Sequence, residues 1–275
     1  MPVVTKLSGF LVVLAAVFGV AFLTGAQSAT LLAPPAVHDN TLGGLAASVD
    51  GYTLAAVEPE LEPGPDQFVE LRLTGPDGAP VDELDSMDQM PYAMMHLFAV
   101  RRDLTGFQHI TPAPGEGTSW WALLSLTPGP WRVVVELQPK GLGRPISLGV
   151  DLAVRGDYRP EPLPPAVDTL PVNGLEARRS GALSTRSSTQ IAVTVTEGDE
   201  PVTDLQPSHG APGHAVIIRP GDLALSYRHA LPDGGTGPRL EFAGGVPEPG
   251  TYAVFVEFYR AERQHLVAYT VEARR

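Results

Sequence analysis

The chain contains no cysteine, and this absence excludes three kinds of chemistry. Without thiols there is no disulfide framework, no thiolate metal site and no cysteine nucleophile. Lysine is also scarce, since it occurs only at Lys6 and Lys140, and the formal net charge is −12. Contacts to phosphate need clustered basic side chains. An acidic chain without a basic stripe is therefore not expected to bind nucleic acid.

Motifs of the common enzyme classes are absent as well. The sequence has no Gly-x-Ser-x-Gly elbow, no glycine-rich phosphate loop and no His-Glu-x-x-His pair. We therefore predict a non-catalytic protein, because a fold alone confers no activity. A Ser/His/Asp triad assembled from distant positions is the enzyme alternative that one sequence leaves open.

Useful helical periodicity is missing after residue 30, and the one long apolar run is Gly9–Ala26. No charged residue falls between Lys6 and Asp39. This pattern predicts that residues 1–30 are either an uncleaved transmembrane anchor or a cleaved signal segment. Because a basic residue precedes the run, we expect a single-pass cell-membrane protein whose C-terminal ectodomain lies outside. Cleavage of the segment would make the protein secreted.

Glycine and proline are abundant, with 29 and 28 residues, and they separate short apolar runs. Within residues 68–73 the apolar side chains alternate, with Val69, Leu71 and Leu73 on one face, as in a half-buried strand. The same reasoning predicts further strands at residues 96–101, 119–126, 131–137, 147–154, 191–195, 252–258 and 265–271.

The chain also repeats itself. Segments that begin at Pro80, His96, His109 and Pro128 return at Pro201, His214, His229 and Pro249, with offsets of 121, 118, 120 and 121 residues. A nearly constant offset indicates two copies of one domain. We predict an all-β protein of two tandem immunoglobulin-like β-sandwich domains after the N-terminal helix, with roughly seven strands in each copy. An up-and-down barrel is the alternative topology.

Composition sets the expected domain boundaries. Small and polar residues follow the N-terminal run and predict a tether at residues 31–48. Four prolines fall within residues 160–165, and such a segment is stiff and cannot join a sheet. We therefore predict a first domain at residues 49–155, a proline-rich linker at 156–168 and a second domain at 169–275.

Matched histidines are the first candidate site. His96 and His109 in copy one correspond in this alignment to His214 and His229 in copy two. Imidazole binds copper, zinc or nickel well, so each pair is a candidate metal site, which His209 and His265 could join in copy two. The alternative is that each histidine at a strand edge is solvated or hydrogen-bonded to the backbone.

Methionines cluster immediately before His96. All except the initiator are Met87, Met90, Met94 and Met95. Thioether sulfur is a soft ligand that suits Cu(I), so Met94 and Met95 could complete the copy-one site with His96 and His109. The alternative is that these methionines fill gaps under a loop.

Two matched glutamates, Glu136 and Glu257, fall mid-strand on the face opposite to the predicted core. We expect solvated carboxylates there, or cross-strand partners of the matched arginines Arg101 and Arg219.

Three segments resemble a known family: Met95 to His109, Gly156-Asp157-Tyr158 with the proline linker, and Gly213-His214-Ala215-Val216. The family comprises membrane-anchored bacterial extracytoplasmic proteins, largely uncharacterised and often described as heavy-metal-binding or copper-associated. The resemblance implies a metal site built on imidazoles. In that family a His-x-His-Pro pattern is typical, whereas here Thr111 follows His109 and Leu231 follows His229 at the second position.

Together these features predict a non-catalytic extracytoplasmic binding protein. The predicted ligand is copper or another soft or borderline metal, bound through His96, His109, Met94, Met95, His214, His229 and His265. The predicted partners are the membrane, through the N-terminal helix, a metal ion and a protein. The alternative function is a metal-independent surface scaffold or protein-interaction module with a decayed metal site.

Overall fold

The computed structural model describes residues 41–81, 83–85, 95–115, 119–186, 190–232 and 235–275. All regular elements assigned in these residues are β-strands, so the all-β prediction is confirmed. None of the described residues belongs to a helix long and apolar enough to cross a membrane. The predicted segment at residues 1–30 and most of the tether lie outside the described residues. Residues Asp39–Arg275 form one compact unit.

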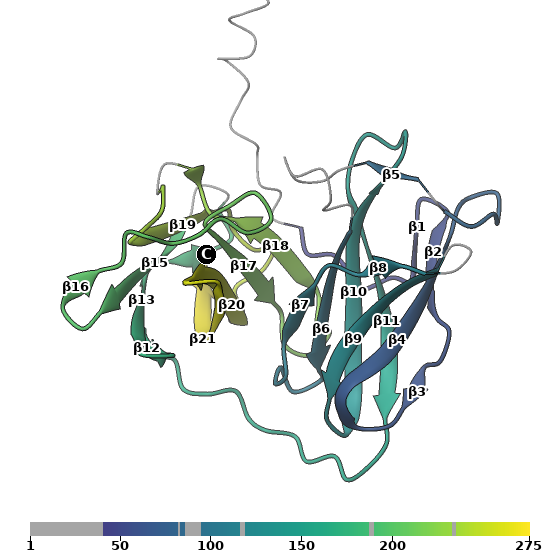
Figure 1. Cartoon of the computed structure of the whole chain (residues 1–275), viewed down its shortest axis with the longest axis horizontal. Coiled ribbons are helices and arrows are strands. Elements are labelled where there is room, and N and C mark those ends of the chain that lie inside the picture. Colours follow the sequence, from purple (N-terminus) through teal and green to yellow (C-terminus); the bar gives the residue numbers. More distant parts are fainter. Residues whose placement is uncertain (1–40, 82, 86–94, 116–118, 187–189, 233–234) are drawn as a thin grey trace, which may run out of the picture. The chain divides into compact units, whose positions relative to one another are not determined.

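The first half of this unit contains two sheets that pack face to face (Figure 1). The outer sheet has the order β1-β2-β4-β9-β8, and the inner sheet has the order β3-β11-β10-β6-β7 with β5 paired to β10. Their bounds are β1 Ser48–Val49, β2 Tyr52–Ala56, β3 Glu60–Leu61, β4 Gly64–Thr74, β5 Leu84–Asp85, β6 Met95–Arg101, β7 Gln108–Ile110, β8 Ala113–Pro114, β9 Ser119–Leu126, β10 Gly129–Pro139 and β11 Ile146–Val154.

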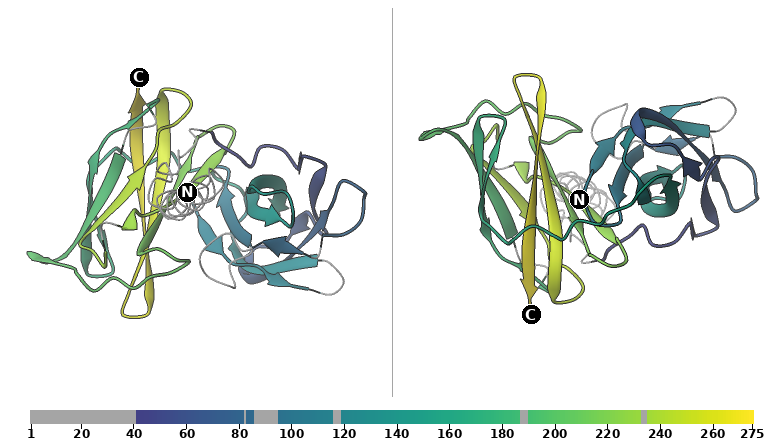
Figure 2. Two further views of the ribbon diagram at one scale, coloured as in Figure 1. Left: turned by 90° about the horizontal axis from the view of Figure 1, so that it is seen from above. Right: turned by 90° about the horizontal axis from the view of Figure 1, so that it is seen from below.

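The second half repeats this plan. Its outer sheet has the order β12-β13-β15-β16 with β19 also paired to β15, and its inner sheet has the order β14-β21-β20-β17-β18. Their bounds are β12 Thr169–Val172, β13 Leu175–Gly181, β14 Leu183–Ser184, β15 Gln190–Glu197, β16 Glu200–Pro201, β17 Gly213–Ile218, β18 Leu225–His229, β19 Arg239–Ala243, β20 Gly250–Arg260 and β21 Arg263–Arg274. In both views of Figure 2 the two sets of strands form separate groups.

Alternating side chains build a core between the two sheets of each half. Val69, Leu71 and Leu73 of β4 point into the first core, as predicted, together with alternate residues of β6 and β10. Ile191 and Val193 of β15 belong to the second core with alternate residues of β20. The sequence-predicted strands all occur, most of them extended by a few residues at their ends.

A third apolar cluster lies between the inner sheets. It joins Phe98, Val100 and Val134 of the first half to side chains of the second half. Phe107 stacks on Phe255, with ring centroids 4.3 Å apart and an interplanar angle of 13°. Strands β6 and β17 are therefore buried on both faces, one against their own core and one against the other half. This second buried face holds the two halves together, because apolar area is removed from water there as well.

Polar contacts reinforce this interface. The backbone of Gly43, before β1, pairs with Leu225 of β18 through two hydrogen bonds of 2.7 and 3.0 Å. The guanidinium of Arg132 in β10 donates to the carbonyl oxygens of Gly44 and Leu45. The segment that precedes the first strand is thus attached to both halves.

Strands β6 and β17 are followed by turns of the same kind. Arg101 pairs with Asp103 in the first half, and Arg219 pairs with Asp222 in the second. The next residue is a leucine with positive φ in both cases, 68° at Leu104 and 63° at Leu223. A left-handed leucine is costly, so its recurrence supports a structural repeat. These pairs also correct the expectation that Arg101 and Arg219 contact Glu136 and Glu257.

Asp103 attaches the proline-rich linker to the first half. Its carboxylate accepts hydrogen bonds from Arg101, from the Thr105 hydroxyl at 2.8 Å and from the Glu161 N–H at 2.9 Å. Burial alone would raise the pKa of Asp103, but these hydrogen bonds outweigh it and lower the pKa to about 2. The linker reaches the second half through the Thr270 hydroxyl, which donates to Pro164 O at 2.7 Å.

We predict that Asp103→Asn lowers the free energy of unfolding by about 2 kcal/mol at pH 7. Because the folded-state pKa of Asp103 is depressed, this stabilisation is present at pH values above the unfolded-state pKa near 4. It is lost as the pH falls toward 2. Urea unfolding at pH 7 and at pH 3 measures the difference. Asp157→Asn, which removes an exposed ion pair to Arg159, is the control and should change stability little. A deficit for Asp103→Asn that stays equal at both pH values would contradict this account.

Candidate metal site

Five of the seven histidines of the chain gather where the inner sheets meet. They are His96 of β6, His109 of β7, His209 of the turn before β17, His214 of β17 and His229 of β18. Strand alternation explains the first: Met95, Leu97 and Ala99 enter the first core, so His96 and Phe98 face the other half. The interface therefore combines apolar packing with a cluster of imidazoles.

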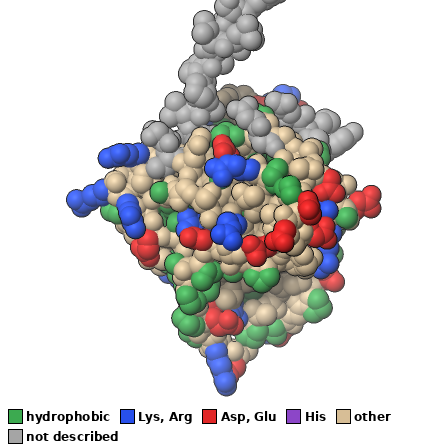
Figure 3. Space-filling view, turned by 90° about the vertical axis from the view of Figure 1, so that its left-hand side faces the viewer, with side chains coloured by type: hydrophobic (Ala, Val, Ile, Leu, Met, Phe, Trp, Pro, Cys, Tyr) green, Lys and Arg blue, Asp and Glu red, His purple; other side chains and the backbone are tan. Residues whose placement is uncertain are grey.

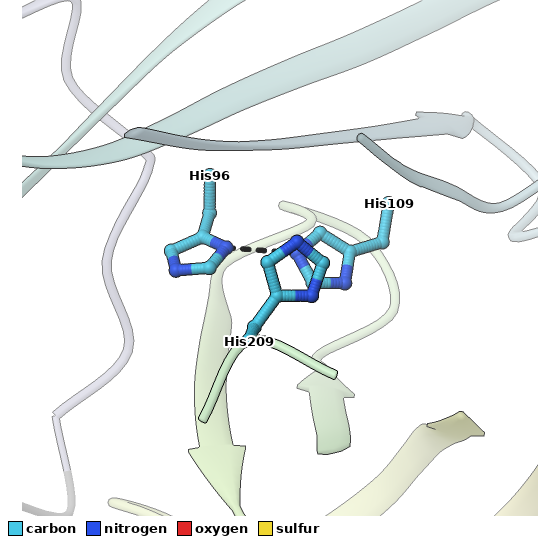
Figure 4. Close-up of side chains that lie close together, drawn as sticks. All are labelled: His96, His109 and His209. Carbon is cyan, nitrogen blue, oxygen red and sulfur yellow. Dashed lines mark hydrogen bonds between the residues drawn. The ribbon is translucent and has the colours of Figure 1, made fainter. Parts of the chain in front are cut away.

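Three of these rings converge (Figure 4). His96 and His109 project from the first half and His209 from the second. One ligand nitrogen from each ring lies within 4.8 Å of the other two. His96 Nδ1 and His109 Nε2 share a hydrogen bond of 3.0 Å. The three ring centroids are 5.1, 5.2 and 5.0 Å apart.

Glu257 of β20 holds His109 from the opposite half. The Nδ1–H of His109 donates to Glu257 Oε2 at 2.7 Å, and both side chains are at most 3% exposed. Gln264 donates to the other carboxylate oxygen at 3.0 Å. Burial raises the pKa of Glu257 to about 7, against the lowering effects of His209, the Gln264 hydrogen bond and His96. The expectation of a solvated carboxylate at Glu257 was wrong, because the face opposite to the core is covered by the other half.

His214 lies beside the three converging rings and is 1% exposed. Its ring centroid is 5.6 Å from that of His209 and 6.1 Å from that of His109. Neither of its ring nitrogens has a hydrogen-bond partner among the residues that the structure describes. Burial, followed by the neighbouring histidines, lowers the pKa of His214 to about 2. Two unsatisfied buried nitrogens are costly, which calls for an explanation at this site.

Aromatic rings enclose the cluster. The Tyr227 ring lies 4.7 Å from His96 and 5.0 Å from His229, measured between centroids. Phe98 stacks on His109 at 4.7 Å. Both ring nitrogens of His209 are hydrogen-bonded, Nδ1 to the Ser208 hydroxyl at 3.0 Å and Nε2 to the Thr111 hydroxyl of the first half at 2.9 Å. The imidazoles of His96, His109 and His214 therefore lie in apolar, largely dehydrated surroundings, whereas those of His209 and His229 are partly exposed.

The strand register corrects one part of the sequence alignment. His96 pairs with Glu136 and His214 pairs with Glu257, so these positions are equivalent, as predicted. Phe98 pairs with His109, however, and Val216 pairs with Tyr227. His109 is therefore equivalent to Tyr227, not to His229, and Thr111 is equivalent to His229. A shift of two residues keeps the same strand face, which is why the sequence pattern alone did not reveal it.

The predicted ligands fall into two groups. The structure brings together His96, His109, His214 and His229, not as two separate pairs but as one cluster, and His209 joins it. Met95 is fully buried in the first core, on the opposite face of β6. His265 stacks on Phe258, 5.1 Å between centroids, and bonds to Asn173, away from the other histidines. Met87, Met90 and Met94 lie outside the described residues.

Sequence reasoning missed two contributors to the site. Glu257 was noted but placed in solvent, and Tyr227 was not singled out. A signal for Glu257 existed, because the strand around it is apolar on both faces: Val254 and Val256 alternate with Phe255. Such a run is typical of a strand that is buried on both sides.

The surface of the second half is unlike this interface. On the face shown in Figure 3, acidic and basic side chains are interspersed. In the second half, Arg178 and Glu176 form an exposed ion pair. Charges of both signs on this face are consistent with solubility rather than with one dominant field.

Comparisons with known proteins are informative about part of the chain. Residues 170–275 match a family model described as a domain of unknown function (DUF8832). No curated protein matches the chain. These comparisons do not extend to membrane anchoring or to metal association, so both stay predictions.

Solved structures similar to the chain include three bacterial examples at low identity. The fibronectin(III)-like modules of Clostridium thermocellum CbhA are 10% identical, with 80% of this chain and 93% of that chain covered and a TM-score of 0.22. The Escherichia coli adhesin FdeC is 15% identical, with 82% and 65% covered and a TM-score of 0.25. Salmonella alpha-2-macroglobulin reacted with methylamine is 14% identical, with 84% and 15% covered and a TM-score of 0.26. This chain thus spans a small part of the last protein, and at these scores the architecture rests on the strand pairing itself.

We predict that His214→Phe makes the metal-free protein less sensitive to acid. The folded-state pKa of His214 is depressed below the unfolded-state pKa near 6.5. As the pH falls below 6.5, the unfolded chain binds a proton that the folded protein does not, and His214 destabilises the folded state increasingly. The stability of the variant relative to the wild type should therefore rise by about 1 kcal/mol per pH unit between pH 6.5 and 4.5. Chemical unfolding at several pH values measures this difference, and parallel curves for the two proteins would contradict it.

Proposed function

We propose that the protein is a non-catalytic, extracytoplasmic metal-binding protein. Its metal site consists of His96, His109 and His209, with the His214 nitrogens next to them. The observation that carries this proposal is the convergence of the first three rings in a buried interface. The predicted immunoglobulin-like domains at residues 49–155 and 169–275, the linker at 156–168 and the N-terminal membrane segment belong to the same proposal.

The ring spacing supports a tetrahedral ion. Metal–nitrogen bonds of about 2.0–2.1 Å place two ligand nitrogens roughly 3.3 Å apart and two imidazole centroids roughly 5 Å apart. The converging rings have centroid separations of 5.0 to 5.2 Å. The 3.0 Å hydrogen bond between His96 and His109 is close to the ligand spacing, so an ion would replace the shared proton after both rings turn to direct their lone pairs at it.

The donor set favours a borderline divalent ion. Met95 contributes its thioether to the first core, so the described part of the site offers imidazole nitrogens only. Imidazole suits Cu²⁺, Zn²⁺ and Ni²⁺, and Cu²⁺ binds most tightly in the usual order of divalent metals. We therefore propose copper in the divalent state, or zinc, in preference to Cu(I).

We predict that the purified protein binds one Cu²⁺ or Zn²⁺ per chain with a Kd below about 1 μM, measured by calorimetry or by competition with a chelator. His96→Ala combined with His109→Ala should weaken binding at least 100-fold, because two ligands are lost. His265→Ala and Met95→Leu are the controls and should bind as the wild type does. Binding weaker than micromolar, or binding unaffected by the double substitution, would refute a metal site here.

The second candidate function is a metal-independent scaffold or protein-interaction module. One observation favours it: Phe68 and Leu123 are paired in register on the outer sheet of the first half and are 55% and 45% exposed. Phe68 also stacks on Trp121, with centroids 5.7 Å apart. Exposed apolar side chains that adjoin one another are typical of interaction surfaces. A protein whose stability and binding are indifferent to Cu²⁺ and Zn²⁺ would favour this function.

A further inference from the structure

The ligands of the proposed site come from both halves of the molecule. His96 and His109 belong to the first half, and His209 and His214 belong to the second. The hydrogen bonds around the site also cross the interface, from His109 to Glu257 and between Thr111 and His209. An ion bound at this position would therefore contact both halves, each of which has its own core.

The halves also meet without any ion. The apolar cluster of the inner sheets, the strand pairing of Gly43 with Leu225 and the hydrogen bond from Arg102 to Gly221 O all join them. The linker keeps them connected in any case. A bridging ion would add to an existing contact, and tethering makes its second set of ligands available at high effective concentration.

Glu257 has the geometry of a carboxylate behind a metal-bound histidine. Its Oε2 accepts the Nδ1–H of His109 at 2.7 Å, which fixes the tautomer and leaves Nε2 of that ring with its lone pair toward His96. Its Oε1 accepts from Gln264, which fixes the orientation of the carboxylate itself. Carboxylates in this position orient the ligand and increase its basicity, and their loss commonly weakens metal binding 10- to 100-fold.

We propose that the ion is a clamp between the two halves and that Glu257 is the positioning residue through which the second half sets the metal affinity of His109 in the first. This inference rests on the proposed metal site. It adds that only the docked arrangement of the halves provides the full ligand set. Metal binding and docking are then linked, and each strengthens the other by the same factor.

The repeat provides a matched control for Glu257. Glu136 of β10 occupies the equivalent position in the first half, paired with His96 in register, but it is only partly buried. In the full-length chain, Glu257→Ala should weaken Zn²⁺ binding 10- to 100-fold, and Glu136→Ala should change it less than threefold. Glu257→Gln keeps the volume and one oxygen acceptor and should recover part of the loss. If Glu257→Ala does not fold, the Gln variant still tests the proposal. Its Zn²⁺ affinity should be lower than that of the wild type, but by less than tenfold.

Hydrogen exchange tests the clamp in the wild-type chain. At a Zn²⁺ concentration 100 times the Kd, amides of β6 and β7 and amides of β17 and β18 should all exchange up to about 100-fold more slowly. Amides of the outer-sheet strand β2, which carries none of the proposed ligands, serve as the internal control and should change less. A copper-loaded sample adds a spectroscopic readout, because Glu257→Ala should alter the nitrogen couplings in the paramagnetic resonance spectrum and Glu136→Ala should not.

The outcomes separate this inference from the function beneath it. If the wild type binds neither Zn²⁺ nor Cu²⁺, the proposed function fails. If the wild type binds Zn²⁺ but Glu257→Ala binds it equally well, Glu257 is not a positioning residue and the inference is overturned. Protection confined to one half of the molecule would overturn the clamp in the same way, while leaving the metal site intact.

Discussion

The second buried face of strands β6 and β17 is the constraint on which the site depends. A strand in a two-sheet sandwich normally covers a core with one face and meets water with the other. Here the outward faces of both inner sheets are apolar, with Phe98 and Val100 on one and Val216 and Ile218 on the other. Burying them against each other places His96, His214 and Glu257, which lie on those faces, in a dry environment. The burial of these three side chains follows from the apolar residues around them.

This dry environment accounts for the chemistry of the cluster. A buried carboxylate needs partners, and Glu257 has His109 and Gln264. A buried imidazole needs them equally, yet His214 has none among the described residues. A folded protein tolerates such a cost where it serves a function. In the proposed function a metal ion occupies the centre of the converging rings, next to the His214 nitrogens.

Much of the architecture could be predicted from the amino-acid sequence. Alternation identified the strands around Leu71, Val133 and Val254 and assigned their core faces correctly. Successive side chains of a strand point to opposite faces of the sheet, so an apolar residue at every second position marks the buried face. The internal repeat located the equivalent histidines His96 and His214. The contact between the two inner sheets could not be predicted from alternation. A strand such as β6 is apolar throughout, and its sequence does not say whether another sheet of the same chain or some other partner covers the second face.

The site was therefore recognised in its parts but not in its arrangement. All five of its histidines were noted, but as two sites, one in each copy, with His209 as a possible addition to the second. Their convergence depends on the packing of the two halves against each other, which no local pattern encodes. Met95 illustrates the opposite error. Proximity to His96 in sequence suggested a shared ion, but neighbouring residues of a strand point to opposite faces, so the thioether lies in the core.

X-ray absorption spectroscopy of the zinc-loaded protein tests the central claim most directly, because it identifies the atoms bound to the ion. We expect three or four nitrogen ligands at about 2.0–2.1 Å, with the outer-shell scattering of imidazole. A sulfur shell at about 2.3 Å, or coordination by oxygen alone, would contradict it.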